Sequence, residues 1–442
     1  MGRRRAHAPL HILINGLTVG RLEKAADGAV SFQYEPSWLD WSDRFPISLS
    51  LPLQRAAWRG AAVNAVFDNL LPDNPTVRKQ VAEKTGAKGT DSYSLLEEIG
   101  RDCIGAMQFL PDGLDVDTSG AISAEDISDA KIETLLDTLA RAPLGLDPEE
   151  GFRISIAGAQ EKTALLFHEG RWKRPLGATP TTHILKPQLG RIPTASGEVD
   201  MSHSVDNEHY CLALMRAFGL RTANTEIATF GKKRVLVVKR FDRAWRADGR
   251  LLRLPQEDMC QALSTPSTRK YQEHGGPGAQ AILGLLQEAD DPARDRMDFF
   301  RSQILFWLIG ATDGHAKNFS VFLKPGGRFE LTPFYDVLTA QPAFDAKRIP
   351  HKRYRLAMSA GASPHYRIDD VLGRHFVQSG KAAGLGPTLM RKVMDEIHEA
   401  AETAPARALS EMPGDFHAEA HDAIKVILPR RLKMLDTAYD VL

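Results

Sequence analysis

The chain has 442 residues, of which 43% are apolar and 25% are charged, the proportions of an ordinary globular protein. Lysine plus arginine equals aspartate plus glutamate at 56 each, so the net charge of zero excludes a whole-chain field that attracts nucleic acid or membrane. The three cysteines lie far apart, fit no zinc or disulfide pattern, and indicate a reducing compartment. No secretory signal core and no apolar run of ~20 residues is present, so we expect a cytoplasmic protein without a membrane span.

The N-terminal part predicts a mixed α/β region. Asn15-Gly16 favours a type I′ turn, so the apolar residues on either side of it predict a β-hairpin. Alternation of apolar and polar residues predicts strands, and helical spacing predicts helices. The predicted strands are 11–14, 17–19, 29–34 and 47–51, and the predicted helices are 63–70 and 123–139.

A segment rich in proline, glycine and acidic residues, 142–151, is the best candidate for a linker. After it we expect strands at 153–156, 163–167, 182–186 and 234–240, and a helix at 205–218. From about residue 292 the pattern predicts a buried helix, a hairpin across Gly326-Gly327, and then helices to the end. The chain is thus expected to divide into segments 1–141, 142–245 and 246–442.

Phosphoryl transfer requires a loop of small residues over the phosphates, a lysine, a base and metal ligands, and such residues occur here in that order. The loop candidate is Ser155–Lys162 (SIAGAQEK), whose small side chains let backbone N–H groups approach phosphate, although the same string also fits a plain β-turn. The lysine candidate is Lys186, at the end of an apolar strand, with Glu208 as a weakly indicated partner. An exposed lysine at a strand end is the commoner reading of such a position.

The strongest local signal is the pair Asp313 and Asn318, which has the Asp-x4-Asn spacing of a kinase catalytic loop. The aspartate is expected to orient or deprotonate the acceptor hydroxyl, and the asparagine to hold magnesium. Asp336 follows the predicted hairpin, where a kinase carries its second metal-binding aspartate. Each signal alone has a plain structural alternative, but the order of all four favours a kinase.

These stretches resemble the HipA family of toxin kinases over almost the whole chain, from about residue 10 into the C-terminal helices. The strings that carry the resemblance in the second half are FRISIAGAQEKTALL (152–166), PTTHILK (180–186), SVDNE (204–208), LPQEDMCQ (254–261), WLIGATDGHAKNFSV (307–321) and LTPFYD (331–336). FDNLLPD (67–73) and EIGRD (98–102) match as well.

The resemblance implies an α/β, two-lobed protein-kinase-like fold with an N-terminal α/β subdomain and a mainly helical C-terminal lobe. It implies a bacterial serine/threonine kinase that uses ATP and Mg²⁺ and is neutralised by HipB, a DNA-binding antitoxin. The best-known member phosphorylates glutamyl-tRNA synthetase, which causes growth arrest and drug tolerance. An aminoacyl-tRNA synthetase is therefore the expected protein substrate.

The resemblance also assigns roles to residues of this chain. Asp313 is the catalytic aspartate, Ser155 the autophosphorylation site, and Asn318 and Asp336 the metal ligands. The remaining ATP-binding residues are Ala157, Gly158, Ala159, Gln160, Glu161, Lys162, Lys186, Lys239, Arg240, Phe241, His315, Ala316, Lys317 and Tyr335.

Two positions depart from the family pattern. The hinge begins with Lys239, where the familiar member has an acidic residue, but hinge contacts run mainly through backbone. Lys381 matches one basic residue of the family's DNA-contacting stretch, whereas the second falls at Gly384. Operator DNA is therefore expected to be bound mainly through the antitoxin.

Two other functions are compatible with the residues. A small-molecule or lipid kinase shares the Asp-x4-Asn loop, and nothing in the sequence encodes the acceptor. A catalytically silent co-repressor of its own operon is the second alternative, and it predicts a degraded site. Lys186, Asp313, Asn318 and Asp336 are all intact, which favours an active enzyme.

Overall fold

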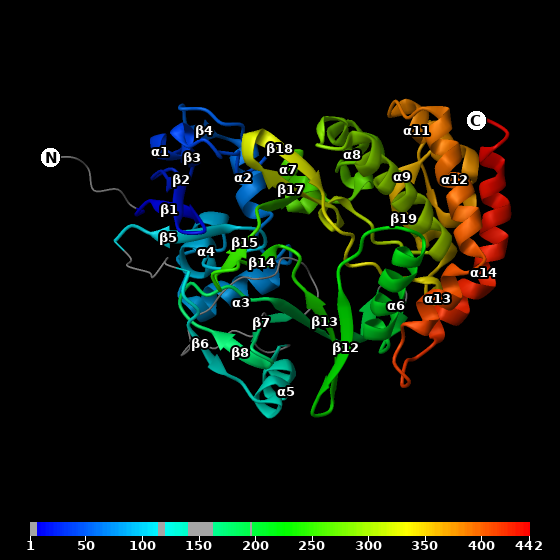
Figure 1. Ribbon diagram of the computed structural model, residues 1–442, viewed down its shortest axis with the longest axis horizontal. Helices are drawn as coiled ribbons and strands as arrows, with labels where there is room; N and C mark the ends of the chain where they lie inside the picture. The colour runs from blue at the N-terminus through cyan, green and yellow to red at the C-terminus, as the bar shows by residue number, and fades with distance from the viewer. Residues whose placement is uncertain (1–6, 114–119, 140–161, 195–196) are drawn as a thin grey trace. The chain divides into compact units, whose positions relative to one another are not determined.

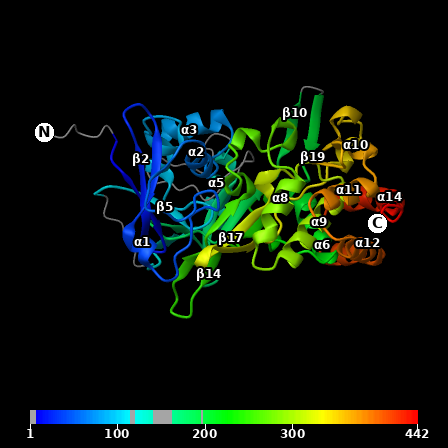
Figure 2. The same ribbon diagram turned by 90° about the horizontal axis from the view of Figure 1, so that it is seen from above.

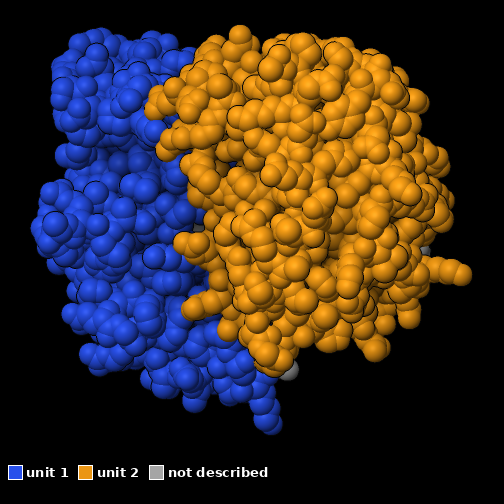
Figure 3. Space-filling model, turned by 45° about the vertical axis from the view of Figure 1, so that its right-hand side comes forward, with its two compact units in different colours: residues 1–187, 228–268, 320–329 blue, residues 188–227, 269–319, 330–442 orange. Residues whose placement is uncertain are grey.

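The computed structural model describes residues 7–113, 120–139, 162–194 and 197–442 (Figure 1). The chain forms two compact units, coloured separately in Figure 3. Unit 1 contains Met1–Pro187, Ala228–Thr268 and Ser320–Phe329, and unit 2 contains Gln188–Ile227, Arg269–Phe319 and Glu330–Leu442. This division differs from the three contiguous segments expected above, whose boundaries stay predictions. The predicted linker at 142–151 and the strand at 153–156 lie outside the described residues.

Unit 1 begins with a five-stranded antiparallel sheet in the order β4-β3-β2-β1-β5. Its strands are β1 (Leu10–Ile14), β2 (Leu17–Lys24), β3 (Val30–Tyr34), β4 (Trp58–Arg59) and β5 (Met107–Pro111). The helices of this region are α1 (Pro36–Asp40), α2 (Ala61–Asp68), α3 (Pro75–Thr85) and α4 (Ser92–Ile99). The predicted hairpin is confirmed, because Asn15 and Gly16 both have the positive φ of a type I′ turn, 49° and 86°.

The predicted strand at 47–51 is wrong, because this segment forms turns whose polar groups bond to residues outside the segment. Ile47 N–H donates to the Tyr34 hydroxyl at 3.0 Å, and Leu49 N–H donates to Glu257 Oε1 at 2.7 Å. The Ser50 hydroxyl donates to the backbone oxygen of Gln261 at 2.8 Å. Alternation of apolar residues here reflects burial of the segment rather than pairing in a sheet.

The buried carboxyl of Glu257 predicts a pH dependence of stability. Burial raises the pKa of Glu257 to about 8, against which the Leu49 N–H bond acts. In the unfolded chain this carboxyl ionises near its ordinary pKa. At a pH between the unfolded-state and the folded-state pKa, unfolding therefore releases a proton, and a rise in pH favours the unfolded state. We expect the Tm to fall between about pH 5 and about pH 8, and Glu257→Gln to reduce that fall.

Thermal unfolding followed by circular dichroism across this pH range measures the effect. Glu226→Gln, at an exposed glutamate, is the matched control and should keep the wild-type slope. Parallel curves for wild type and Glu257→Gln would contradict the assignment.

A second sheet of unit 1 has the order β12-β13-β9-β7-β8-β6. Its strands are β6 (Ala124–Asp126), β7 (Thr163–His168), β8 (Arg171–Pro175), β9 (His183–Pro187), β12 (Thr225–Phe230) and β13 (Lys233–Lys239). Helix α5 (Asp129–Thr138) covers it through a buried apolar cluster of Ile132, Leu136, Leu139, Leu165, Leu185, Phe230, Val235 and Val237. This packing confirms the strands predicted around 163–167, 182–186 and 234–240.

The helix predicted from residue 123 begins later than expected. Residues 124–126 form β6, which pairs with β8, because Glu125 and Asp126 form cross-strand ion pairs with basic residues of β8. The N-cap of α5 is Ser128, whose hydroxyl accepts the Lys131 N–H at 3.4 Å.

Five short strands and one short helix also contribute to unit 1. Strands β14 (Arg243–Trp245) and β15 (Leu251–Arg253) form a hairpin. Strand β16 (Gln256–Asp258), which leads into α7 (Met259–Ala262), pairs with β17 (Ser320–Lys324). Strand β18 (Arg328–Leu331) pairs with β17 and runs into unit 2, which confirms the hairpin predicted across Gly326-Gly327.

Unit 2 is mainly helical (Figures 1 and 2). Its helices are α6 (Ser204–Ala217), α8 (Ala279–Leu285), α9 (Pro292–Ile309), α10 (Gln341–Asp345), α11 (Gly373–Ala382), α12 (Pro387–Ala401), α13 (Ala404–Ser410) and α14 (Glu419–Leu435). Helix α9 is the predicted buried helix, and both α12 and α14 pack against it. The predicted core face of α12, which includes Met390 and Ile397, is fully buried.

Two hairpins belong to unit 2. They are β10 (Gly190–Thr194) with β11 (Gly197–Met201), and β19 (Arg355–Ala360) with β20 (His365–Arg367). The second corrects the expectation that the C-terminal region after the catalytic loop and its hairpin is helical throughout. Within the described ranges, no helix is both long and apolar enough to span a membrane.

Candidate active site

The predicted catalytic loop starts where α9 ends. Gly310 terminates the helix with a φ of 72°, and a Cβ at this position would collide with the Tyr354 hydroxyl. The guanidinium of Arg431 donates to the backbone oxygens of Trp307 and Leu308 at 3.1 and 3.0 Å. These bonds give side-chain partners to carbonyls of the last helical turn, so the start of the loop is fixed.

Within the loop, the backbone holds an exposed aspartate next to buried polar residues. Asp313 is exposed, and its backbone oxygen accepts the His315 N–H at 2.8 Å. The backbone oxygen of His315 in turn accepts the Asn318 N–H at 2.9 Å, and this bond closes the short turn Ala316–Asn318. Asn318 is 3% exposed, so its amide is held in one place while the Asp313 carboxylate faces solvent.

The structure brings Asp336 to this loop, as the kinase pattern predicts. The Asn318 side-chain amide donates to the Asp336 backbone oxygen at 3.3 Å and lies 3.5 Å from Asp336 Oδ2. The hydroxyl of Tyr335 donates to the Lys317 backbone oxygen at 2.9 Å. Asp336 also has a φ of 59°, a left-handed conformation that is uncommon for a residue other than glycine and typical of functional sites.

A buried asparagine anchors the segment after Asp336. Asn207, on α6, donates its amide to the Thr339 backbone oxygen at 2.9 Å and accepts the Thr339 N–H at 2.9 Å. Sequence reasoning placed Asn207 within a family string but gave it no role. The available signal was an asparagine among the apolar residues of the helix predicted at 205–218, because a buried amide requires a partner.

His315 is close enough to Asp313 and Asp336 to be affected by their charges, and its side chain is neutral at neutral pH. Burial lowers the pKa of His315, and the charge of Lys270 lowers it further, while the carboxylates of Asp313 and Asp336 oppose both effects. Its ring meets the ring of Tyr271 edge to face, with centroids 5.0 Å apart. Tyr271, which the sequence did not identify, donates its hydroxyl to Asp313 Oδ1 at 2.6 Å.

The predicted phosphate lysines lie in unit 1 on neighbouring strands. Lys186 lies near the end of β9 and Lys162 directly precedes β7, and both side chains are buried, with exposures of 6% and 7%. Thr163 pairs with Leu185, so one step further along the antiparallel register places Lys162 opposite Lys186. Directly opposed residues of neighbouring strands point to the same face of a sheet, so the two lysine side chains lie on one face. The predicted partner Glu208 belongs to unit 2, and that pairing stays a prediction.

The predicted hinge residues have different surroundings. Lys239 is exposed at the end of β13, and Phe241 meets Phe322 edge to face at 5.8 Å. Arg240 is 4% exposed and donates its backbone N–H to the Thr182 oxygen at 2.9 Å. The Arg240 side chain forms ion pairs in the network described next. Any contact of this residue with a nucleotide would therefore be made by its backbone.

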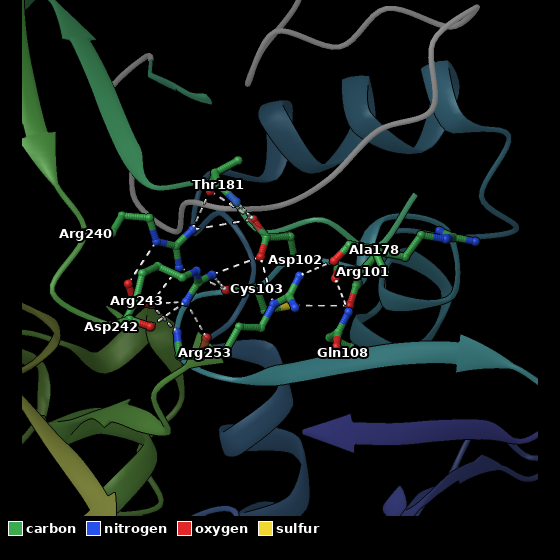
Figure 4. A network of polar contacts seen from close by, with 12 residues as sticks. Arg101, Asp102, Cys103, Gln108, Ala178, Thr181, Arg240, Asp242, Arg243 and Arg253 are labelled. Atoms are coloured by element: carbon green, nitrogen blue, oxygen red, sulfur yellow. Dashed lines mark hydrogen bonds and ion pairs between the residues drawn. The ribbon is translucent and has the colours of Figure 1, made fainter. Parts of the chain in front are cut away.

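The ion network of unit 1 consists of Asp102, Asp242, Arg240, Arg243 and Arg253 (Figure 4). The Asp102 carboxylate forms ion pairs with Arg243, at an N···O distance of 2.9 Å, and with Arg253, at 3.1 Å. Arg240 Nη1 lies 3.7 Å from the same carboxylate. Asp242 pairs with Arg240 at 2.6 Å and with Arg243 at 2.9 Å. The network connects Asp102, the last residue of the EIGRD string, to Arg240 of the predicted hinge. It therefore fixes the backbone that follows β13.

Arg240, Asp242 and Arg243 stay charged at neutral pH despite their burial. Burial lowers the pKa of Arg243 to about 10, and the charge of Arg240 contributes, whereas the two aspartates oppose the shift. The two neighbouring guanidinium groups hold the pKa of Asp242 below its usual range despite burial. Sequence reasoning missed this cluster, because Asp102 is more than a hundred residues from its arginine partners.

The remaining predicted positions are less informative. Ser155 and residues 157–161, the predicted autophosphorylation site and phosphate loop, lie outside the described residues. Lys381 is exposed on α11, and its ammonium donates to the Val441 backbone oxygen at 2.5 Å, so its predicted DNA contact stays a prediction.

The Asn318–Asp336 pair fits a magnesium ion. Magnesium prefers oxygen ligands and commonly takes only one or two from protein, with phosphate and water supplying the rest. The contact is made by the amide nitrogen of Asn318, and it places the side-chain amide, whose oxygen is the possible ligand, beside the Asp336 carboxylate. Among the described residues, no group of three or more histidine, cysteine or acidic side chains is arranged to hold a metal ion, so a closed all-protein metal site is not built there.

Comparisons with known proteins show which family and which relatives the chain is similar to. Residues 154–405 match the family model of the HipA-like C-terminal domain, and residues 10–110 match that of the HipA N-terminal domain. A Sinorhizobium fredii protein named "Putative kinase Y4mE" is 31% identical over 406 residues, which cover 91% of this chain and 92% of that protein. The serine/threonine-protein kinase toxin HipA of Shewanella oneidensis is 27% identical over 345 residues, 75% of each chain.

The fold is similar to a solved structure. Shewanella oneidensis HipA, in a complex with HipB and operator DNA, superposes with a TM-score of 0.79 and covers 98% of this chain and 100% of that one, at 22% identity. The fold predicted from the sequence is thereby confirmed.

Proposed function

The chain belongs to the HipA family of kinases, and from this premise we propose that it transfers the γ-phosphate of ATP to a serine hydroxyl of a protein. The observation that carries the proposal is the contact between Asn318 and Asp336, in the same loop region as the exposed Asp313. It joins the Asp-x4-Asn loop to the second aspartate, the arrangement that a kinase requires for metal and acceptor.

Each residue then has a distinct task. Asp313 accepts a hydrogen bond from the acceptor hydroxyl and receives its proton as the bond to phosphorus forms. Asn318 and Asp336 hold magnesium, which neutralises charge on the β- and γ-phosphates when ATP is bound. Lys162 and Lys186 interact with phosphate oxygens, and the backbone of 239–241 holds the adenine. Residues 157–161 complete the phosphate loop, and His315–Lys317 and Tyr335 shape the nucleotide site.

We further propose that Ser155 is a self-phosphorylation site that limits the enzyme. A phosphate there adds close to two negative charges beside the loop at 157–161, which disfavours ATP on that loop. After incubation with ATP and magnesium, the intact mass is expected to rise by one phosphate that peptide mapping assigns to Ser155. Ser155→Ala should remove this phosphate, and the phosphorylated form should bind ATP more weakly.

The same experiment separates the alternatives. Phosphate on another residue, or unchanged ATP affinity after modification of Ser155, would contradict self-limitation but not kinase activity. ATP binding without any phosphorylation would favour a silent co-repressor. Phosphorylation of a metabolite or lipid, with none of protein, would favour the small-molecule alternative.

Partners are proposed from the family. The Shewanella oneidensis HipA structure contains HipB and operator DNA, and we propose that a HipB-like antitoxin binds this chain and carries most of the DNA contact, with Lys381 a weaker candidate. The protein substrate is proposed to be an aminoacyl-tRNA synthetase, so that activity arrests growth and gives antibiotic tolerance. The three buried free thiols fit a cytoplasmic location.

A further inference from the structure

Tyr271 lies in the segment between α7 and α8, outside the kinase motifs, yet it makes the closest side-chain contact with Asp313. Its hydroxyl donates to Asp313 Oδ1 at 2.6 Å, and its ring meets His315 edge to face. We propose that Tyr271 is a positioning residue that orients the Asp313 carboxylate toward the acceptor hydroxyl. This inference rests on the proposed function.

The turn that carries Tyr271 is attached to the catalytic loop on one side and to β19 on the other. The Lys270 backbone oxygen accepts the Ala316 N–H at 3.2 Å. The Gln272 side chain accepts the Ser359 N–H at 2.8 Å and donates to the Ser359 hydroxyl at 2.9 Å. Because residues on both sides of Tyr271 are bonded to these elements, its hydroxyl has a fixed place relative to the loop.

The turn is also closed on itself. The Tyr271 backbone oxygen accepts the N–H groups of His274 and Gly276, each at 3.0 Å. A Cβ at Gly276 would collide with the Arg269 backbone oxygen, so only glycine allows this close approach. Tyr271 therefore stands on a tightly folded turn rather than on a free loop.

The contact uses one carboxylate oxygen and leaves the other for chemistry. A distance of 2.6 Å is typical of a hydroxyl that donates to an ionised carboxylate. Within the described ranges, Tyr271 is the one side chain that hydrogen-bonds Asp313, and the carboxylate is otherwise exposed. Without the tyrosine hydroxyl, an exposed aspartate samples several rotamers, and the share that points Oδ2 at the acceptor falls.

Tyr271→Phe tests the inference, because it keeps the ring against His315 and removes only the hydroxyl. We expect the rate of phosphate incorporation into the full-length chain, at saturating magnesium-ATP, to fall about tenfold. The apparent KM for ATP and the thermal midpoint should stay unchanged, since the hydroxyl bonds Asp313, which is exposed and is not one of the proposed nucleotide ligands. Tyr366→Phe, at a half-buried tyrosine of β20 in the same unit, is the matched control and should keep the full rate.

A double-variant comparison separates positioning from an unrelated effect. If the hydroxyl acts through Asp313, Tyr271→Phe should cause no further loss in an Asp313→Asn background. An unchanged or higher rate in Tyr271→Phe, or an equal loss in both backgrounds, would overturn the positioning role. If Asp313→Asn itself kept the full rate, the catalytic assignment in the proposed function would be overturned as well.

Discussion

Asp313→Asn is expected to slow phosphate transfer from ATP by about a thousandfold, the contribution of a well-placed general base. The amide matches the carboxylate in size and still accepts a hydrogen bond from Tyr271, so the loop should keep its form. It carries no charge and cannot take the proton of the acceptor hydroxyl. The measurement is the rate of phosphate incorporation with saturating magnesium-ATP, followed by mass spectrometry.

ATP affinity measured by calorimetry should be the same in wild type and Asp313→Asn, because the proposed nucleotide and metal ligands are other residues. Asp43→Asn, at an exposed aspartate of unit 1, is the matched control and should keep the full rate. If Asp313→Asn retained more than about a tenth of the wild-type rate, a general base elsewhere would have to be sought.

Asp102→Asn is expected to destabilise the fold by about 3–5 kcal/mol, the usual result of breaking a buried ion pair from one side. Asp102 is fully buried and contacts Arg240, Arg243 and Arg253. The wild-type cluster has three guanidinium groups and two carboxylates, and the variant leaves only the Asp242 carboxylate to offset three buried positive charges. Urea unfolding followed by fluorescence measures the difference.

Asp248→Asn provides the comparison for this prediction. Asp248 also pairs with two arginines, Arg246 and Arg250, but the group is fully exposed, and exposed pairs contribute little. Its urea midpoint should match that of the wild type. Equal midpoints for Asp102→Asn and Asp248→Asn would show that the buried network is not important for stability. A loss of ATP affinity in folded Asp102→Asn would indicate that the network also holds the hinge.

The sequence predicted those parts of the fold that short-range patterns determine. The turn at Asn15-Gly16, the buried helix α9 and the hairpin of β17 and β18 each follow from a local pattern of turn residues or apolar spacing. The contact of Asn318 with Asp336 could be predicted as well, because both residues follow recognisable elements of a kinase-like order.

What could not be predicted depends on partners that are distant in the sequence. The segment at 47–51 alternates like a strand, but Glu257 and Gln261 supply two of its hydrogen bonds from more than two hundred residues away. Tyr271 is 42 positions from Asp313, and nothing near it in the sequence indicates the contact. The start of α5 was misplaced for a similar reason, because β8 recruits residues 124–126 into a sheet.

The interleaving of the two units has a consequence for synthesis on the ribosome. Strand β16 of unit 1 pairs with β17, which is translated some sixty residues later (Gln256 with Phe322). Helix α6 of unit 2 packs against α13 and α14, so its neighbours appear only as the last residues are added. Because these contacts join distant parts of the chain, neither unit can finish folding early. A nascent or prematurely terminated chain therefore contains the catalytic motifs in its sequence without the packed units that give them their geometry.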